Sequence, residues 1–265
     1  MIVRTEAVIL RSLKYGESSK ILHFYTRLFG RLSVIAKGAR GKKSRFGSSL
    51  EPMSIVSAVL YKHENRDLHL LSQCDAILPL RKLTDDLDKM AVAMSVIGLV
   101  ETIAHSEERN EPLFDILTET LRVINGATNS ALSALYFFEV RSLEILGFRP
   151  DFHTCQGCSA PVGDFPSAGT HDARCGFGYA GVFCATCARE GYGTRPVGIQ
   201  TIKALQWLQD RSTAEQAMNL SLSEHLRREI GESLRLFLRH HIEGFRDPKS
   251  EGVFSSITGV QSDTV

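Results

Sequence analysis

The stretch 155–187 holds two short motifs, CQGC at residues 155–158 and CATC at residues 184–187, in a glycine-rich segment without a sustained helical pattern. Two cysteines at this spacing can hold one metal ion from a single tight turn, and two such turns complete a tetrahedral sulfur site for which zinc is the usual metal. We therefore expect one structural Zn2+, bound by Cys155, Cys158, Cys184 and Cys187. Four sulfur ligands leave no open position for an activated water, so this site indicates folding and not metal catalysis.

Three further residues leave the ligand set open. Cys175 lies between the two motifs without a second cysteine two or three positions away, so we interpret it as a buried, small apolar residue. His153 and His171 are potential substitute ligands. A redox pair or incidental thiols are the alternatives to a metal site, but the doubled motif favours the metal.

Composition and charge limit the class of protein. The chain has 265 residues, of which 43% are hydrophobic and 23% charged, as in an ordinary globular protein. Its cysteine usage fits a reducing cytosol. The first ten residues carry Arg4 and Glu6 and do not form a secretory signal, and no run reaches the roughly 18 apolar residues that a membrane span needs. We expect a cytosolic protein.

The net charge of +1 conceals a marked segregation. Residues 1–80 contain 13 Lys+Arg and 6 Asp+Glu, whereas the remaining residues contain 18 and 24. The excess of positive charge therefore lies at the N-terminus, where we look for a nucleic-acid interface.

Five β-type runs with turn residues between them occupy the same N-terminal region. They are Ile2–Leu13, Lys20–Leu28, Arg31–Lys37, Ile55–His63 and Leu68–Ile77. Their number and spacing predict a small closed barrel such as an OB-fold, although an SH3-like barrel would give a similar pattern.

The third and fourth runs are separated by the most basic segment of the chain. Its five positive side chains are Lys37, Arg40, Lys42, Lys43 and Arg45. Charge runs are often merely solvated, but here the excess continues through Arg4, Arg11, Lys14 and Arg31. A basic loop on a small barrel is typical of single-stranded nucleic-acid binding, in which rings stack on bases. Among the aromatic residues of this region, we expect Phe46 to be the ring that meets a base.

Helical patterns follow the barrel. They cover Asp85–His105, 110–126, Ser130–Leu146 and Ile199–Gln209, and a last helix is expected to open with a capping box at Ser221 and Glu224. The predicted architecture is an α+β multidomain protein: an OB-fold barrel (1–80), a helical domain (81–150 and 196–247) with an inserted zinc-ribbon-like module of four cysteine ligands (151–195), and a polar tail (248–265).

No catalytic motif stands out in the sequence. There is no nucleophile elbow and no His-Glu-x-x-His, and the phosphate-loop-like stretch 38–44 lacks residues that the Walker pattern requires. We expect a binding protein and not an enzyme. A zinc-ribbon transcription or translation factor and a nucleic-acid-processing enzyme remain the alternatives.

The order of these parts resembles the RecO family of DNA repair and recombination mediators over essentially the full length. The similar pieces are the basic loop (37–40, 44–46 and 50–52), the helix that leads into the first cysteine pair (138–147), the second pair with its preceding Gly181-Val182-Phe183, and Pro248-Lys249-Ser250. The long insert that contains Cys175 departs from the family pattern.

The resemblance implies binding of single- and double-stranded DNA and annealing of complementary strands. It also implies that the protein works with RecR, and in some pathways RecF, to help RecA replace single-stranded-DNA-binding protein (SSB), whose tail the family recognises. By position, Lys37, Arg40, Lys42, Lys43 and Arg45 would contact DNA, with Arg4, Lys14 and Arg31 as weaker candidates.

Overall fold

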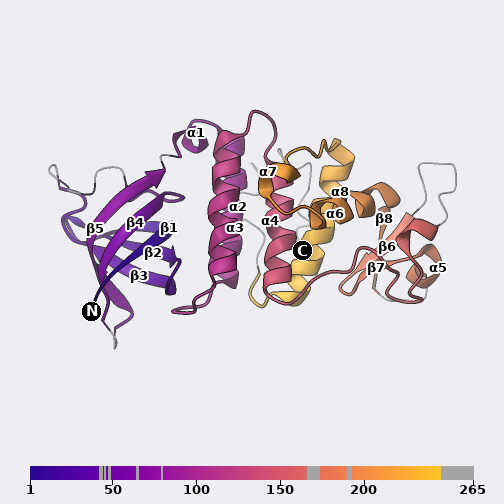
Figure 1. The fold of residues 1–265 in the computed structure, drawn as a ribbon, viewed down its shortest axis with the longest axis horizontal. Coiled ribbons are helices and arrows are strands. Elements are labelled where there is room, and N and C mark those ends of the chain that lie inside the picture. The colour runs from indigo at the N-terminus through magenta and orange to yellow at the C-terminus, as the bar shows by residue number, and fades with distance from the viewer. Residues whose placement is uncertain are drawn as a thin grey trace. The chain divides into compact units, whose positions relative to one another are not determined.

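The computed structural model describes residues 1–41, 44, 46, 49–63, 66–78, 80–165, 174–189 and 193–245. Contacts group the chain into two compact units, Met1–Gly126 and Ala127–Val265 (Figure 1). The predictions for Lys42, Lys43, Arg45, His171 and the tail from residue 248 concern residues outside the described ranges. The division into a barrel, a two-part helical domain, a zinc module and a tail stays a prediction.

The first unit begins with a closed five-stranded barrel. Its strands are β1 (Ile2–Tyr15), β2 (Ser19–Thr26), β3 (Gly30–Ala36), β4 (Ile55–Tyr61) and β5 (Leu68–Leu78), in the order β1-β2-β3-β5-β4. Neighbouring strands are antiparallel except β3 and β5, which pair in parallel. The predicted OB-like barrel and all five of its strands are confirmed.

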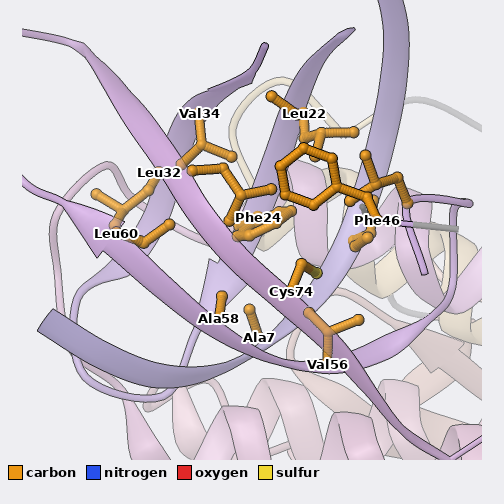
Figure 2. Close-up of a cluster of buried hydrophobic side chains, with 14 residues drawn as sticks. Ala7, Leu22, Phe24, Leu32, Val34, Phe46, Val56, Ala58, Leu60 and Cys74 are labelled. Atoms are coloured by element: carbon orange, nitrogen blue, oxygen red, sulfur yellow. The ribbon is translucent and has the colours of Figure 1, made fainter. Parts of the chain in front are cut away.

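The barrel interior is filled by every second side chain of its strands, as the two-residue period of a strand requires (Figure 2). Leu22 and Phe24 from β2 meet Leu32 and Val34 from β3 in this cluster. Phe46, from the connection between β3 and β4, enters the same interior and is only 2% exposed. The prediction that Phe46 stacks on a base is therefore wrong, because its ring belongs to the barrel core.

Three helices complete the first unit: α1 (Arg81–Thr84), α2 (Leu87–Ile103) and α3 (Glu111–Gly126). Asp86 caps α2 by accepting hydrogen bonds from the backbone N–H groups of Asp88 and Lys89. The helices cover one outer face of the barrel. Tyr25 points outward from β2, and the centroid of its ring lies 6.1 Å from that of Phe114 in α3. Its hydroxyl donates a hydrogen bond to the carbonyl of Asn110.

Charged contacts join the barrel to the segment that follows α2. Lys62 Nζ lies 2.8 Å from Glu107 Oε2, and Nε2 of the buried His69 lies 3.5 Å from Glu107 Oε1. The backbone N–H of His63 donates to His69 Nδ1. Gly30 is required at its position because its φ is +62° and a Cβ there would lie 2.1 Å from the carbonyl oxygen of Glu108.

The second unit combines helices with a small three-stranded sheet. Its elements are α4 (Leu132–Ile145), η1 (Val162–Asp164), β6 (Arg174–Gly178), β7 (Gly181–Phe183), α5 (Ala185–Ala188), β8 (Arg195–Gly198), α6 (Ile199–Gln209), α7 (Ala214–Ala217) and α8 (Glu224–His241). Helix α4 is buried on all sides over residues 132–140 and packs against α6, α7 and α8. The sheet has the order β7-β6-β8.

One helix start differs from its prediction. The residue that caps α8 is Ser223, whose hydroxyl accepts from the N–H of Leu226, so the helix begins at Glu224 and Ser221 lies outside it. Among the described residues, we find no helix that combines the length and apolarity of a membrane span.

Replacing the core ring Phe46 tests its assignment to the barrel. Phe46→Ala should lower the free energy of unfolding by about 3–5 kcal/mol, because it removes a buried ring and leaves a cavity. Tyr15 is 52% exposed, and Tyr15→Ala should change stability by no more than about 0.5 kcal/mol. Urea denaturation of both variants measures the difference, and equal values would contradict the core assignment.

The stability of the first unit should fall as the pH is lowered below about 6.5, the ordinary pKa of histidine. Burial, followed by the charge of Lys62, lowers the pKa of His69, although Glu107 partly offsets these effects. The unfolded chain therefore binds more protons in this range, so stability is complete above pH 6.5 and decreases as the pH falls toward the lowered pKa.

Urea denaturation at pH 7.5 and pH 5.5, about one unit on either side of that value, measures this effect. His69→Gln should reduce the difference in stability between the two conditions. The same substitution at His105, which is exposed, is the matched control and should leave the difference near that of the wild type. An unchanged difference in His69→Gln would rule out the buried ring as its source.

Candidate metal centre and candidate nucleic-acid interface

The first cysteine turn is organised by a carboxylate that precedes it. Asp151 accepts hydrogen bonds from the backbone N–H groups of His153 and Thr154, from the Thr154 hydroxyl and from the Gln156 side chain. Burial raises the pKa of Asp151, but these donors outweigh it and hold the pKa below its usual value. The ionised carboxylate therefore fixes the chain immediately before Cys155.

The second cysteine turn begins where β7 ends. Cys184 follows Phe183, and the next residues form the single turn α5. The two turns are tied together, because the N–H of Gln156 donates to the carbonyl of Val182 at 2.8 Å. A loop-rich segment is thus held by backbone contacts as well as by its cysteines.

The four predicted ligand sulfurs converge. The Sγ atoms of Cys155, Cys158, Cys184 and Cys187 all lie within 4.8 Å of one another. Gly157 allows this approach, since a Cβ there would lie 2.8 Å from the Cys187 sulfur. Such a cluster of four thiols is a suitable site for a tetrahedral metal ion.

The electrostatics of the cluster favour a thiolate at Cys155. Burial raises the pKa of this thiol, but backbone N–H groups, first among them that of Cys184 at 3.2 Å from the sulfur, lower it to about 6. A thiolate and not a thiol is the form that binds a metal. The turn therefore supplies at least one ligand in its reactive form.

The other candidate ligands of the sequence that the structure describes lie outside the four-sulfur cluster. Cys175 lies in β6, is 5% exposed and is not a member of the four-sulfur cluster. Burial raises the pKa of its thiol to about 11. Nε2 of His153 faces Asp210 at 3.8 Å and also lies outside the cluster.

Three of the predicted basic residues come together at one end of the barrel. Arg40 donates from its N–H to the carbonyl of Ser18, and from its guanidinium to the carbonyl of Gly16, so it lies on the β1–β2 turn. Lys14 stands opposite Lys20, and Lys20 stands opposite Ala36, the residue before Lys37. We call Lys14, Lys37 and Arg40, all exposed, the basic patch.

An exposed ring accompanies the basic patch. Tyr15 follows Lys14 at the end of β1 and is 52% exposed. One acidic residue, Glu17, lies in the same turn. Lys20 is not counted in the basic patch because it is ion-paired with Glu51. The sequence analysis favoured Phe46 as the stacking ring. The position of Tyr15 directly before Gly16, at a turn, could have indicated that Tyr15 is the exposed ring.

Arg4 and Arg31 lie away from the basic patch. Arg4 is exposed, but it is ten residues before Lys14 on β1, about 33 Å along an extended strand. Arg31 is at the start of β3 and donates to the carbonyl of Glu101. Arg4 is therefore too distant along β1 to belong to the basic patch. Arg31 is excluded because its guanidinium is hydrogen-bonded to α2.

Arg31 also lines a polar cavity of about 450 Å³ between the barrel and the helices of the first unit. Its lining contains two cationic side chains, Arg11 and Arg31, and three carboxylates, those of Asp67, Glu101 and Glu107. Arg11 is ion-paired with Glu101. A cavity whose lining holds more carboxylates than guanidinium groups is a poorer site for phosphates than the basic patch.

Two protein-family models match this chain, one over its N-terminal part and one over most of the rest. Residues 1–80 match the family model described as "Recombination protein O N terminal", and residues 84–251 match "Recombination protein O C terminal".

Curated relatives give the same result. A DNA repair protein RecO of Chloroherpeton thalassium is 30% identical over 260 residues, which cover 97% of this chain and 99% of the relative. One from Anaeromyxobacter sp. strain K is 32% identical over 240 residues, 91% of each chain. One from Salinibacter ruber is 28% identical over 272 residues, 98% of this chain and 96% of the relative. This chain belongs to the RecO family of DNA repair proteins.

Proposed function

We propose that the protein is a non-enzymatic recombination mediator that binds single- and double-stranded DNA and anneals complementary strands. With RecR, and in the RecF pathway, it would help RecA load onto single-stranded DNA that is covered by SSB, whose tail it would recognise. The observation that carries this proposal is the exposed basic patch on an OB-like barrel in a member of this family.

The physical basis of annealing is the repulsion between two strands of like charge. Lys14, Lys37 and Arg40 would neutralise phosphates and let a second strand approach. Tyr15 beside them offers a ring for loose stacking, which leaves bases available for pairing. Lys42, Lys43 and Arg45 belong to the same proposal, because they continue the basic loop in the sequence.

We further propose that the four-cysteine cluster holds one structural Zn2+ and that the protein acts in the bacterial cytosol. The donor set of four sulfurs fits zinc, and it leaves the ion no position for a reacting water. The metal would stabilise the two cysteine turns, and DNA binding would be the task of the barrel.

Reversing charge in the basic patch should weaken DNA binding. The double variant Lys14→Glu/Lys37→Glu should bind single-stranded oligonucleotides about tenfold more weakly and anneal complementary strands more slowly, on bare and on SSB-coated strands alike. Its affinity should also depend less on salt, since each lost phosphate contact reduces the slope of log K against log salt by about 0.7.

Arg4→Glu is the matched control for the single variant Lys14→Glu, because each reverses one exposed charge on β1, at opposite ends of the strand. It should have a clearly smaller effect on affinity and on annealing rate. If Arg4→Glu and Lys14→Glu, which change the net charge equally, were equally impaired, binding would follow the net charge of the barrel and the assignment of the patch would fail. Fluorescence anisotropy and a fluorescence annealing assay provide both measurements.

Metal content distinguishes the proposed ligands from Cys175. The wild type should contain about one zinc per chain, and Cys158→Ser should lose most of it because a structural site needs all four ligands. Cys175→Ala should retain the metal. Metal analysis of the purified variants, with circular dichroism as a check of folding, decides this; zinc loss in Cys175→Ala alone would reassign the fourth ligand.

A further inference from the structure

Exposed apolar rings of the second unit gather at one place. Within the described residues after Gly126, only two large hydrophobic side chains are exposed, Phe148 at 39% and Tyr179 at 46%. Both rings contact the same pair of histidines at the end of α8: Phe148 lies 5.2 Å from His241, and Tyr179 lies 4.6 Å from His240, between ring centroids. We call these four residues the aromatic surface.

The aromatic surface is the outer end of a continuous series of rings. His241 lies 4.2 Å from Phe237, which in turn lies 6.2 Å from Phe177. Phe177 and Phe237 are buried. The two exposed rings are therefore connected to the buried core through the histidines, and both remain partly open to solvent.

Tyr179 is held in place from two sides. It lies in the two-residue turn between β6 and β7, where Gly178 pairs with Gly181. Gly181 has φ +124°, and a Cβ there would lie 2.7 Å from the carbonyl of Asp151. From the other side, Nε2 of His241 lies 2.7 Å from the Tyr179 carbonyl and donates to it. Because the backbone of this turn is fixed, little conformational entropy is lost when the Tyr179 ring binds a ligand.

Two arginines adjoin members of the aromatic surface in the sequence. Arg149 follows Phe148, and 66% of its side chain is exposed although one nitrogen lies 3.3 Å from Glu144. The last turn of α8 contains Arg239, His240 and His241 and no acid. Glu243 is the acid that comes next along the chain. Exposed rings with arginines next to them in the sequence are complementary to bases joined by phosphates.

We propose that the aromatic surface is a second stacking site for the bases of single-stranded DNA, so that the second unit contacts a strand through its own residues. The inference rests on the proposed function, since it assigns another DNA-contacting surface to the same activity. Annealing requires two strands, and a second site gives the second strand a place that does not compete with the basic patch. Duplex bases are covered by their neighbours, so this site discriminates in favour of single strands.

An acidic peptide with apolar residues is the other occupant that such a surface would fit. We favour DNA because the rings are arranged as a series of exposed faces and not as an enclosed apolar pocket, and because stacking on bases tolerates any sequence.

The test uses the full-length protein with Tyr179→Ala, and Tyr179→Phe as the matched control that keeps the ring. In the Lys14→Glu/Lys37→Glu background, Tyr179→Ala should lower the affinity for oligothymidylate about tenfold further, because a lost base–ring stack is worth about 1–3 kcal/mol; alone, it should leave binding of duplex DNA as in the wild type. Tyr179→Phe should retain the affinity. Irradiation of an oligonucleotide that carries 5-iododeoxyuridine should cross-link it to Tyr179 or Phe148, as mapped by mass spectrometry.

The outcomes separate this inference from the proposed function. If Tyr179→Ala bound oligothymidylate normally, both alone and in the Lys14→Glu/Lys37→Glu background, the second site would be refuted while the basic patch stood. A loss of binding to an acidic peptide without a change for oligothymidylate would also overturn it. If the wild type bound no DNA, the proposed function would fail and this inference with it. Zinc content and circular dichroism confirm that each variant is folded.

Discussion

The convergence of four thiols from two turns is the constraint on which much of the second unit depends. The described parts of residues 151–189 contain only short elements, so they depend on buried side chains such as Phe152 and Phe177 and on the cysteine cluster for their order. The cysteine turns are tied to β7, and β7 returns from the turn that carries Tyr179. A sulfur-bound metal, which contributes on the order of 10–16 kcal/mol in small peptides, would thus fix the hairpin as well as the turns themselves.

The barrel uses its positive charges in two different ways. Arg11 and Arg31 both contact Glu101 of α2. Arg11 is ion-paired with the Glu101 carboxylate, and Arg31 donates to the Glu101 carbonyl. These arginines contribute to holding α2 against the barrel. Lys14, Lys37 and Arg40 lie at the strand ends, where Arg40 donates to backbone carbonyls of the adjacent turn and to no carboxylate among the described residues. Counting basic residues along the sequence mixes these two groups, and only the structure separates them.

The fold was largely predictable, because its signals are local. The two-residue period of β1–β5 and the 3.6-residue period of the helices depend on neighbouring residues alone, and the four clustered cysteines follow from their spacing. Phe46 shows where this reasoning fails. It follows the basic run and looks exposed in the sequence, but the end of a closed barrel needs an apolar ring to fill it. Which ring serves that purpose depends on tertiary packing, to which the periodicity of a connecting segment gives no guide.

The aromatic surface was unpredictable for the same reason, since Phe148, Tyr179 and His240 are far apart in the sequence. Its proposed role fits the energetics of annealing better than a single tight site would. A protein that anneals strands must bind each of them and also release the product. Two modest contacts within one molecule raise the local concentration of each strand for the other. Each contact remains individually weak, so that base pairing, which removes the bases from the rings, can displace the strands from the protein.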